Sequence, residues 1–383
     1  MTGCTEAAVS EKNEYLTQQL ITYIGNKRAL LDFIGEGVEK VRNKLQKDKL
    51  KIFDVFSGSG IAARYFKKFS ELLIVNDLEK YSKVINECYL SNKCGLDTTA
   101  LREYYRELIE KTENKINNLT VRGINSRTPG IISELYAPEN DNDIKIHDRV
   151  FYTRRNAAYI DTARQLIETL PQDMRKYFLA PLLSEASIHA NTSGVFKGFY
   201  KNRETGIGQF GGKNRDALSR IKGDIILPFP VFSNFNCDTV ICSGDSNKVI
   251  HELPETDLAY IDPPYNQHPY GSNYFMLNLI IDYVKPNNIS RVSGIPDNWN
   301  RSDYNKKSHS YKSFKKLTEE IKSKYLLISF NSEGFIKHDE MVKLLKNIGK
   351  LEVLETKYNA FKGSRNLYNR KIHVKEYLYL VEK

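Results

Sequence analysis

The sequence of 383 residues contains few cysteines and no pair of them at metal-ligand spacing. Its five cysteines are odd in number, and none belongs to a Cys-x-x-Cys pair. This pattern argues against a disulfide scaffold and against a zinc framework built on cysteine. No cluster of His, Cys and Asp replaces it, and we therefore expect no metal site.

Long hydrophobic runs are missing as well. The mean hydropathy is −0.50, and no apolar stretch reaches the length that spans a membrane. The first 13 residues are polar and lack the apolar core of a secretion signal. We expect a cytoplasmic protein whose chain is long enough for one large domain or two ordinary ones.

Basic residues outnumber acidic ones, which gives a net charge of +10. A basic excess favours a polyanionic partner. The chain also has 24 tyrosines, and tyrosine beside Lys or Arg suits stacking on bases. An AT-rich genome would enrich Lys, Asn, Ile and Tyr for other reasons, so composition alone favours nucleic-acid binding only modestly.

The first 95 residues alternate between strand and helix. An apolar strand at 51–56 runs into a Ser-Gly-Ser-Gly turn and a helix at 61–69. A second strand at 72–75 ends at an acid and precedes a helix at 79–90. This order is that of the first half of a doubly wound nucleotide-binding fold.

The alternation stops at about residue 96 and returns at about 237. Residues 96–236 show helical periodicity and a glycine-rich polar stretch at 191–215, which we interpret as an inserted domain. Seven strands are expected in all, the last two antiparallel. The later strands are expected at 239–242, 258–261, 325–330, 352–358 and 373–381, and the later helices at 247–253, 272–284, 312–323 and 338–347.

The glycine turn has the pattern Gly58-x-Gly60-x-x-Ala63. Glycines in such a turn let the backbone approach a ligand closely. Asp77 ends the next strand, where an acid accepts hydrogen bonds from ribose hydroxyls. By itself this pattern suits a nicotinamide-dependent dehydrogenase equally well.

The apolar run at 258–261 ends in Asp262-Pro263-Pro264-Tyr265. Two prolines stop the strand and stiffen the turn that follows. They leave a carboxylate, carbonyls without competing N–H groups, and an aromatic face at the strand end. Without further context this would be a proline turn with a surface tyrosine.

Three motifs together resemble the S-adenosylmethionine-dependent amino-methyltransferases of DNA. Asp54–Gly60 is similar to their Asp-x-Phe-x-Gly-x-Gly loop, and Asp262–Tyr265 to their Asp-Pro-Pro-Tyr motif. Tyr23–Arg28 resembles the N-terminal motif of the Dam-like group. The order of these motifs, with a long insertion before the last, is that of the α group of DNA N6-adenine methyltransferases.

The resemblance implies an α/β fold. Residues 1–95 and 237–383 would form a seven-stranded Rossmann-like methyltransferase sheet, and 96–236 a largely helical inserted target-recognition domain. The cofactor would be S-adenosyl-L-methionine and the substrate double-stranded DNA, with a restriction endonuclease as a possible partner. Catalytic residues would be Asp262, Pro263, Pro264 and Tyr265, and cofactor-binding residues Tyr23, Lys27, Phe56, Ser57, Gly58, Gly60, Asp77, Asp245 and Asp262.

In this interpretation Asp262 and the Pro263 carbonyl each accept one N–H of the adenine amine, while Tyr265 stacks on the flipped base. Asp245 would contact the cofactor's adenine edge or cap the helix at 247–253, and the sequence leaves both open. The insertion resembles the family's recognition domain only loosely. Basic residues expected to contact DNA are Lys197, Lys201, Arg203, Lys213, Arg215, Lys362 and Arg365.

Other functions stay open at this point. Related motifs with Asn in place of Asp262 serve methylation of RNA or protein, and cytosine amino-methyltransferases more often carry Ser there. A non-catalytic DNA-binding protein that kept the fold is a rival of another class, and a dehydrogenase is a more distant one. Binding of S-adenosylmethionine rather than a nicotinamide cofactor would separate the last of these.

Overall fold

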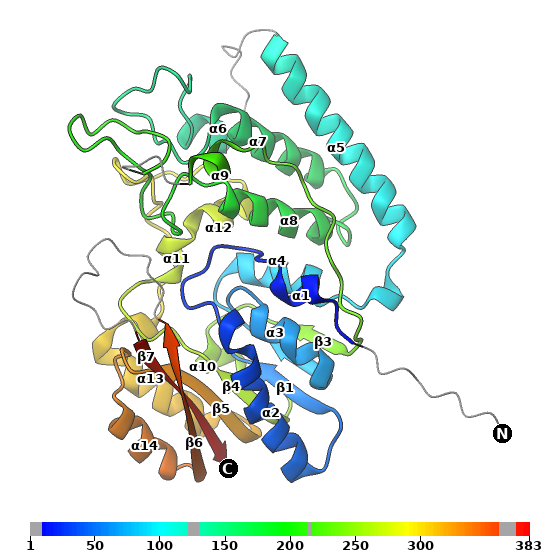
Figure 1. Ribbon diagram of the computed structural model, residues 1–383, viewed down its shortest axis with the longest axis vertical. Helices are drawn as coiled ribbons and strands as arrows, with labels where there is room; N and C mark the ends of the chain where they lie inside the picture. The colour runs from blue at the N-terminus through cyan, green and yellow to red at the C-terminus, as the bar shows by residue number, and fades with distance from the viewer. Residues whose placement is uncertain (1–9, 122–129, 213–216, 360–372) are drawn as a thin grey trace, which may run out of the picture.

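One mixed sheet and a layer of helices beside it make up the molecule (Figure 1). The computed structural model describes residues 10–121, 130–212, 217–359 and 373–383. The sheet has the strand order β3-β2-β1-β4-β5-β7-β6. Its strands are β1 (Leu50–Asp54), β2 (Ser70–Val75), β3 (Asp238–Ile241), β4 (Thr256–Ile261), β5 (Ser323–Asn331), β6 (Lys350–Asn359) and β7 (His373–Glu382).

The sheet is parallel from β3 to β5, and β7 enters antiparallel between β5 and β6. Both expectations from the sequence, seven strands and an antiparallel last pair, are confirmed. The strand order reverses between β1 and β4, because the chain builds outward from β1 in one direction and from β4 in the other. Ligands of such sheets bind at this switch point, beyond the carboxyl ends of the strands.

Helices cover both faces of the sheet because its central strands are apolar on both sides. In β4, Leu258 and Tyr260 face one core, whereas Ala259 and Ile261 face the other. The first face carries α2 (Leu31–Leu45) and α3 (Ile61–Phe66). The second carries α10 (Ser246–Val249), α13 (Lys307–Glu320) and α14 (His338–Lys346).

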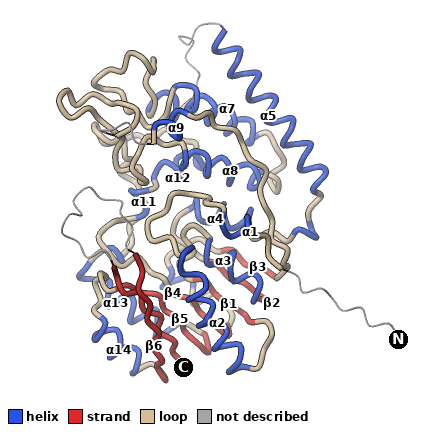
Figure 2. Tube along the Cα trace, in the orientation of Figure 1, coloured by secondary structure: helices blue, strands red, loops and turns tan. Residues whose placement is uncertain are grey.

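The helical layer lies along one side of the sheet (Figures 1 and 2). Its core contains Phe178 and Leu182 from residues 96–236. It also contains Tyr81 and Leu277, which lie outside that range. The layer is therefore packed firmly on the sheet-forming part. Its helices are α1 (Asn13–Thr17), α4 (Lys80–Tyr89), α5 (Thr98–Val121), α6 (Ile131–Leu135), α7 (Arg154–Glu168), α8 (Arg175–Ile188), α9 (Leu218–Lys222), α11 (Tyr270–Asn273) and α12 (Phe275–Asp282).

Several helices differ from their expected limits. The single helix expected at 272–284 is two helices, α11 and α12, and the helix expected at 61–69 ends at Phe66. The helix α13 begins at Lys307 rather than at residue 312, because Ser310, Phe314 and Leu317 form a buried stripe within the basic segment. The helix after β3 ends at Val249 instead of residue 253. Short 3-10 helices lie at Arg28–Leu30, Lys67–Phe69, Lys93–Gly95 and Asp303–Asn305. In the described part of the chain, no helix has the length and apolar character needed to cross a bilayer.

We predict that Leu327→Ala strongly destabilises the fold. Leu327 lies fully buried in β5, and a methyl group placed on Gly37 of α2 would stand only 2.6 Å from its side chain. Truncation leaves a cavity at this tight contact and costs about 2–5 kcal/mol of the free energy of unfolding, measured by urea denaturation. Val353→Ala on β6 is the control, because Val353 is 40% exposed. Equal losses for both variants would contradict this packing.

Candidate active site

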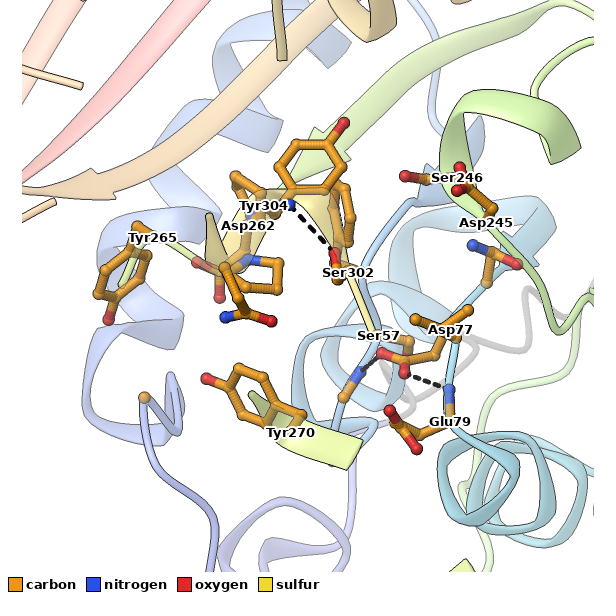
Figure 3. Close-up of a pocket in the computed structure, with 18 of the residues that line it drawn as sticks. Ser57, Asp77, Glu79, Asp245, Ser246, Asp262, Tyr265, Tyr270, Ser302 and Tyr304 are labelled. Carbon is orange, nitrogen blue, oxygen red and sulfur yellow. Dashed lines mark hydrogen bonds between the residues drawn. The ribbon is translucent and has the colours of Figure 1, made fainter. Parts of the chain in front are cut away.

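A pocket of about 340 Å³ opens at the carboxyl ends of the parallel strands. This volume lies in the range of small-molecule and cofactor sites. Asp262, Tyr265 and Tyr270 lie toward one end of it, and Asp77 and Asp245 toward the other (Figure 3). The lining comes from chain segments before and after residues 96–236, at 23–27, 56–62, 76–79, 244–247, 260–271 and 300–316.

The two glycines of the turn after β1 have different surroundings. Gly58 lines the pocket with φ of +53°, and a methyl group there would stand 2.8 Å from the Tyr23 ring. Gly60 is the N-cap of α3 with φ of +74° and does not line the pocket. A methyl group on Gly60 would instead meet the Asn86 amide at 2.8 Å. Gly58 therefore lets the Tyr23 ring pack closely on the glycine turn, while Gly60 permits packing of α3 on α4.

Asp77 is held rigidly at the end of β2. One carboxylate oxygen accepts the Gly58 N–H at 2.8 Å and the other accepts the Glu79 N–H at 2.9 Å (Figure 3). Burial raises the pKa of Asp77 to about 6, although these backbone bonds lower it. The acid is thus fixed in register with the glycine turn, as the sequence spacing indicates.

Glu79 is a pocket residue that the sequence did not reveal. Its carboxylate accepts hydrogen bonds from the side-chain amides of Asn278 at 2.6 Å and Asn300 at 3.1 Å. Burial, and the neighbouring Asp77 charge, raise the pKa of Glu79 to about 7. The only local signal was its position two residues after Asp77, at the N-cap of α4.

Tyr270 of α11 and Tyr274, which lies between α11 and α12, hold the N-terminal motif in place. The Tyr23 ring stacks on Tyr270 and on Tyr274, with centroids 5.0 Å apart in each case. The Ile24 N–H donates to the Tyr274 hydroxyl at 2.8 Å, and the Tyr270 hydroxyl donates to the Ile24 carbonyl at 3.1 Å. The sequence analysis did not identify either tyrosine. The available signal was that Tyr270 and Tyr274 stand four residues apart, directly after Pro269.

Asp262 directly follows β4 and pairs with Lys27. The Lys27 Nζ lies 3.2 Å from Asp262 Oδ1. Burial raises the pKa of Asp262 to about 6, and the Lys27 charge opposes that shift. Pro263, Pro264 and Tyr265 also line the pocket, and the Tyr265 ring packs against Phe330 with centroids 5.5 Å apart. The pocket therefore contains all four residues of this motif.

Asp54, the last residue of β1, is buried beside the same centre. Its side chain is 1% exposed, and neither carboxylate oxygen has a hydrogen-bond partner of good geometry. Burial raises the pKa of Asp54 to about 8; Ser57 offsets part of this shift, and the charge of Asp262 adds to it. The carboxylic acid is therefore largely protonated near neutral pH.

Asp245 caps α10 and also borders the pocket. Its carboxylate accepts the Asn247 N–H at 2.9 Å. The Asn247 side chain in turn accepts from the Tyr304 hydroxyl at 2.8 Å, and Tyr304 packs edge-on against Phe56 with centroids 5.0 Å apart. Of the two roles that the sequence left open, the N-cap is observed, and Tyr304 is an aromatic lining residue that sequence reasoning missed.

The described basic residues expected to contact DNA, which are Lys197, Lys201 and Arg203, do not line the pocket. Lys197 and Arg203 are exposed, and the Lys201 ammonium sits 4.8 Å from the centroid of the Phe199 ring. A bridge between Lys201 and Gly208 closes a short antiparallel turn that carries Lys201 and Arg203. Lys213, Arg215, Lys362 and Arg365 lie outside the described residues.

Within the described ranges, no group of three His, Cys, Asp or Glu side chains is arranged to hold a metal ion.

Comparison with known proteins identifies the family. A family model described as D12 class N6 adenine-specific DNA methyltransferase matches residues 23–344. The chain belongs to this class of adenine-specific DNA methyltransferases. It is 30% identical to the type II methyltransferase M.CviAII of Paramecium bursaria Chlorella virus 1, over 94% of this chain and 98% of that protein.

Two further relatives show how the match varies in extent. The type II methyltransferase M.NlaIII of Neisseria lactamica is 28% identical over 95% of this chain and 99% of its own length. M.FokI of Planomicrobium okeanokoites is 25% identical over 94% of this chain but only 52% of its own length. The D12 methyltransferase described here therefore corresponds to the whole of some relatives and to about half of others.

We predict that Asp54→Asn changes the pH dependence of stability. A buried acid whose folded-state pKa is raised stabilises the fold below its unfolded pKa, and this contribution is lost as pH rises toward about 8. Asn does not titrate, so the melting temperature of the variant relative to wild type should rise by about 2 °C or more between acidic and mildly alkaline pH. Asp282→Asn, at an exposed carboxylate, serves as control. A constant difference would contradict the burial of an uncompensated Asp54.

Proposed function

We propose that this chain transfers the methyl group of S-adenosyl-L-methionine to the exocyclic amine of a flipped adenine at a specific site in double-stranded DNA. We further propose that it is the modification component of a restriction–modification system with a partner endonuclease. The observation that carries the proposal is that Asp262 and Tyr265 share one pocket with the glycine turn and Asp77.

The charges of the pocket support this cofactor. S-adenosylmethionine supplies an electrophilic methyl group on a sulfonium, and it carries an ammonium group as well. Asp77, Glu79 and Asp245 line the pocket, and these acids would attract such a cation. The pyrophosphate of a nicotinamide cofactor would instead bring negative charge among the same acids, which disfavours a dehydrogenase.

The donor set also suits the rest of the cofactor. Asp77 can accept hydrogen bonds from ribose hydroxyls, and Gly58 lines the pocket without a side chain of its own. Phe56 and Tyr304 provide aromatic faces near Asp245 for the adenine ring. Tyr23 and Lys27 would close the opposite end of the pocket.

The chemistry follows from the geometry at the end of β4. The adenine amine is a poor nucleophile because its lone pair is delocalised into the ring. Asp262 and the Pro263 carbonyl can each accept one of its N–H groups, which favours a tetrahedral nitrogen whose lone pair points at the methyl group. Tyr265 would stack on the flipped base, and the departing proton would pass to Asp262 or to water.

The part of the helical layer formed by residues 96–236 would supply target recognition. We assign residues 96–236 to this role and residues 1–95 and 237–383 to catalysis. Lys197, Lys201 and Arg203 are exposed cations that could contact phosphates. The names of the relatives as type II methyltransferases support a role in modification.

We predict that Asp262→Ala abolishes methyl transfer without unfolding the protein. Loss of one acceptor for the amine lowers the single-turnover rate by about 100-fold or more. The assay follows transfer from labelled S-adenosylmethionine to DNA, and Asp282→Ala at an exposed carboxylate should keep the wild-type rate.

Wild-type protein expressed in a methylation-free host should leave N6-methyladenine at one sequence motif. Its absence from all motifs would refute the proposed function.

We predict that replacing Lys197, Lys201 and Arg203 together by Ala weakens DNA binding. Removing one phosphate-binding cation reduces the slope of log affinity against log salt by about 1, so the slope of the triple variant should be smaller by up to about 3. The control replaces Lys343, Lys346 and Lys350, which lie around α14 at the far end of the molecule (Figure 1). An equal reduction in both variants would show that only net charge matters.

A further inference from the structure

A further acidic residue, contributed by the last strand, contacts Lys27 beside Asp262. Glu376 of β7 is 3% exposed, and its Oε1 accepts a hydrogen bond from Lys27 Nζ at 2.9 Å. The same oxygen accepts from the Ser329 hydroxyl at 2.9 Å. The antiparallel pairing of β7 with β5 places Glu376 there, opposite Asn331. No sequence motif pointed to this residue.

Lys27 therefore lies between two buried carboxylates. Its ammonium contacts Glu376 at 2.9 Å and Asp262 at 3.2 Å, and its own side chain is 6% exposed. The two carboxylates share this one cation, so the Lys27 charge neutralises neither of them completely. The titratable groups that face Asp262 are Lys27, Glu376, Asp54, Tyr260 and Tyr270.

The position of Lys27 decides which oxygen of Asp262 remains available. Oδ1, the oxygen beside Lys27, is buried from solvent. Asp262 lines the pocket, so Oδ2 is the oxygen that it can present to a ligand. A lysine that was not held by Glu376 could move across the carboxylate and contact both oxygens, which would leave no free acceptor for the amine.

We propose that Glu376 is a positioning residue for methyl transfer. It holds Lys27 against one oxygen of Asp262 and keeps the other oxygen free for the adenine amine. This inference rests on the proposed function, since it concerns the same reaction. Glu376 touches neither substrate nor cofactor in this scheme and acts through Lys27.

A purely structural role for Glu376, such as linking β7 to Ser329 on β5, makes a different prediction. In Glu376→Gln the amide oxygen can still accept hydrogen bonds from Lys27 and Ser329, so the geometry is kept while the negative charge is removed. The Glu376 charge raises the pKa of Asp262. Its removal should therefore make Asp262 easier to ionise, whereas a structural link has no such effect.

The test measures single-turnover methyl transfer to DNA as a function of pH. In wild type the rate should fall on the acid side as Asp262 becomes protonated. Glu376→Gln should keep most of the rate at neutral pH, and its acid limb should move to lower pH by roughly one unit. Glu376→Ala should lose on the order of 100-fold at every pH, because Lys27 is no longer held. Glu355→Gln, at an exposed carboxylate paired with Lys375, should change neither quantity.

Two results would overturn the inference. One is an acid limb of Glu376→Gln that coincides with that of wild type, and the other is a wild-type rate in a folded Glu376→Ala. If thermal unfolding shows that Glu376→Ala does not fold, the pH profile of Glu376→Gln decides alone. A wild-type protein that transfers no methyl group would instead refute the proposed function, and the inference with it.

Discussion

The parallel pairing of β1 with β4 is the constraint on which the site depends. It sets Asp54 beside Tyr260, and the glycine turn and Asp262 follow these two residues directly. About two hundred residues of chain separate the two strands, and the insertion leaves and returns within that interval. Because the strand order reverses at this pair, the two turns diverge and leave the crevice that becomes the pocket. The glycine turn and the Asp262–Tyr265 turn are thus brought together by the backbone hydrogen bonds between β1 and β4.

The same arrangement brings several acidic side chains together at buried positions around the pocket. Asp54, Asp77, Glu79 and Asp262 all have raised pKa values, and burial is the first cause of each shift. Buried charge without a partner is costly. The fold offsets part of this cost at Asp262 through Lys27, at Asp77 through two backbone N–H groups, and at Glu79 through two side-chain amides. The remaining imbalance favours a cationic ligand over an anionic one. The electrostatic cost of these acids to the fold and their preference for a cationic ligand therefore have one origin.

The sequence was most informative where the determining interactions are local. Apolar runs predicted the strands, and the motif residues Asp262 and Gly58 lie in turns whose shape their own residue types impose. Tyr274 and Glu376 were not predicted because only tertiary contacts bring them to residues that line the pocket, Tyr274 to Tyr23 and Glu376 to Lys27. Glu376 arrives through the β5–β7 register, which no local pattern encodes. The start of α13 was predicted too late. Its first turns are rich in basic and polar residues, so the buried stripe formed by Ser310, Phe314 and Leu317 was not recognised in the sequence.

An aromatic cluster joins the pocket to the helical layer. Tyr23 of the N-terminal motif packs edge-on against Tyr81 of α4 and stacks on Tyr274, and both partners lie in the core that also contains α7 and α8. The helical layer therefore cannot shift as an independent body without disturbing the stack that fixes Tyr23 over the glycine turn. If that layer reads the DNA, its placement and the shape of the cofactor pocket share the same side chains. Target recognition and methyl transfer would then be coupled through packing that already exists without either ligand.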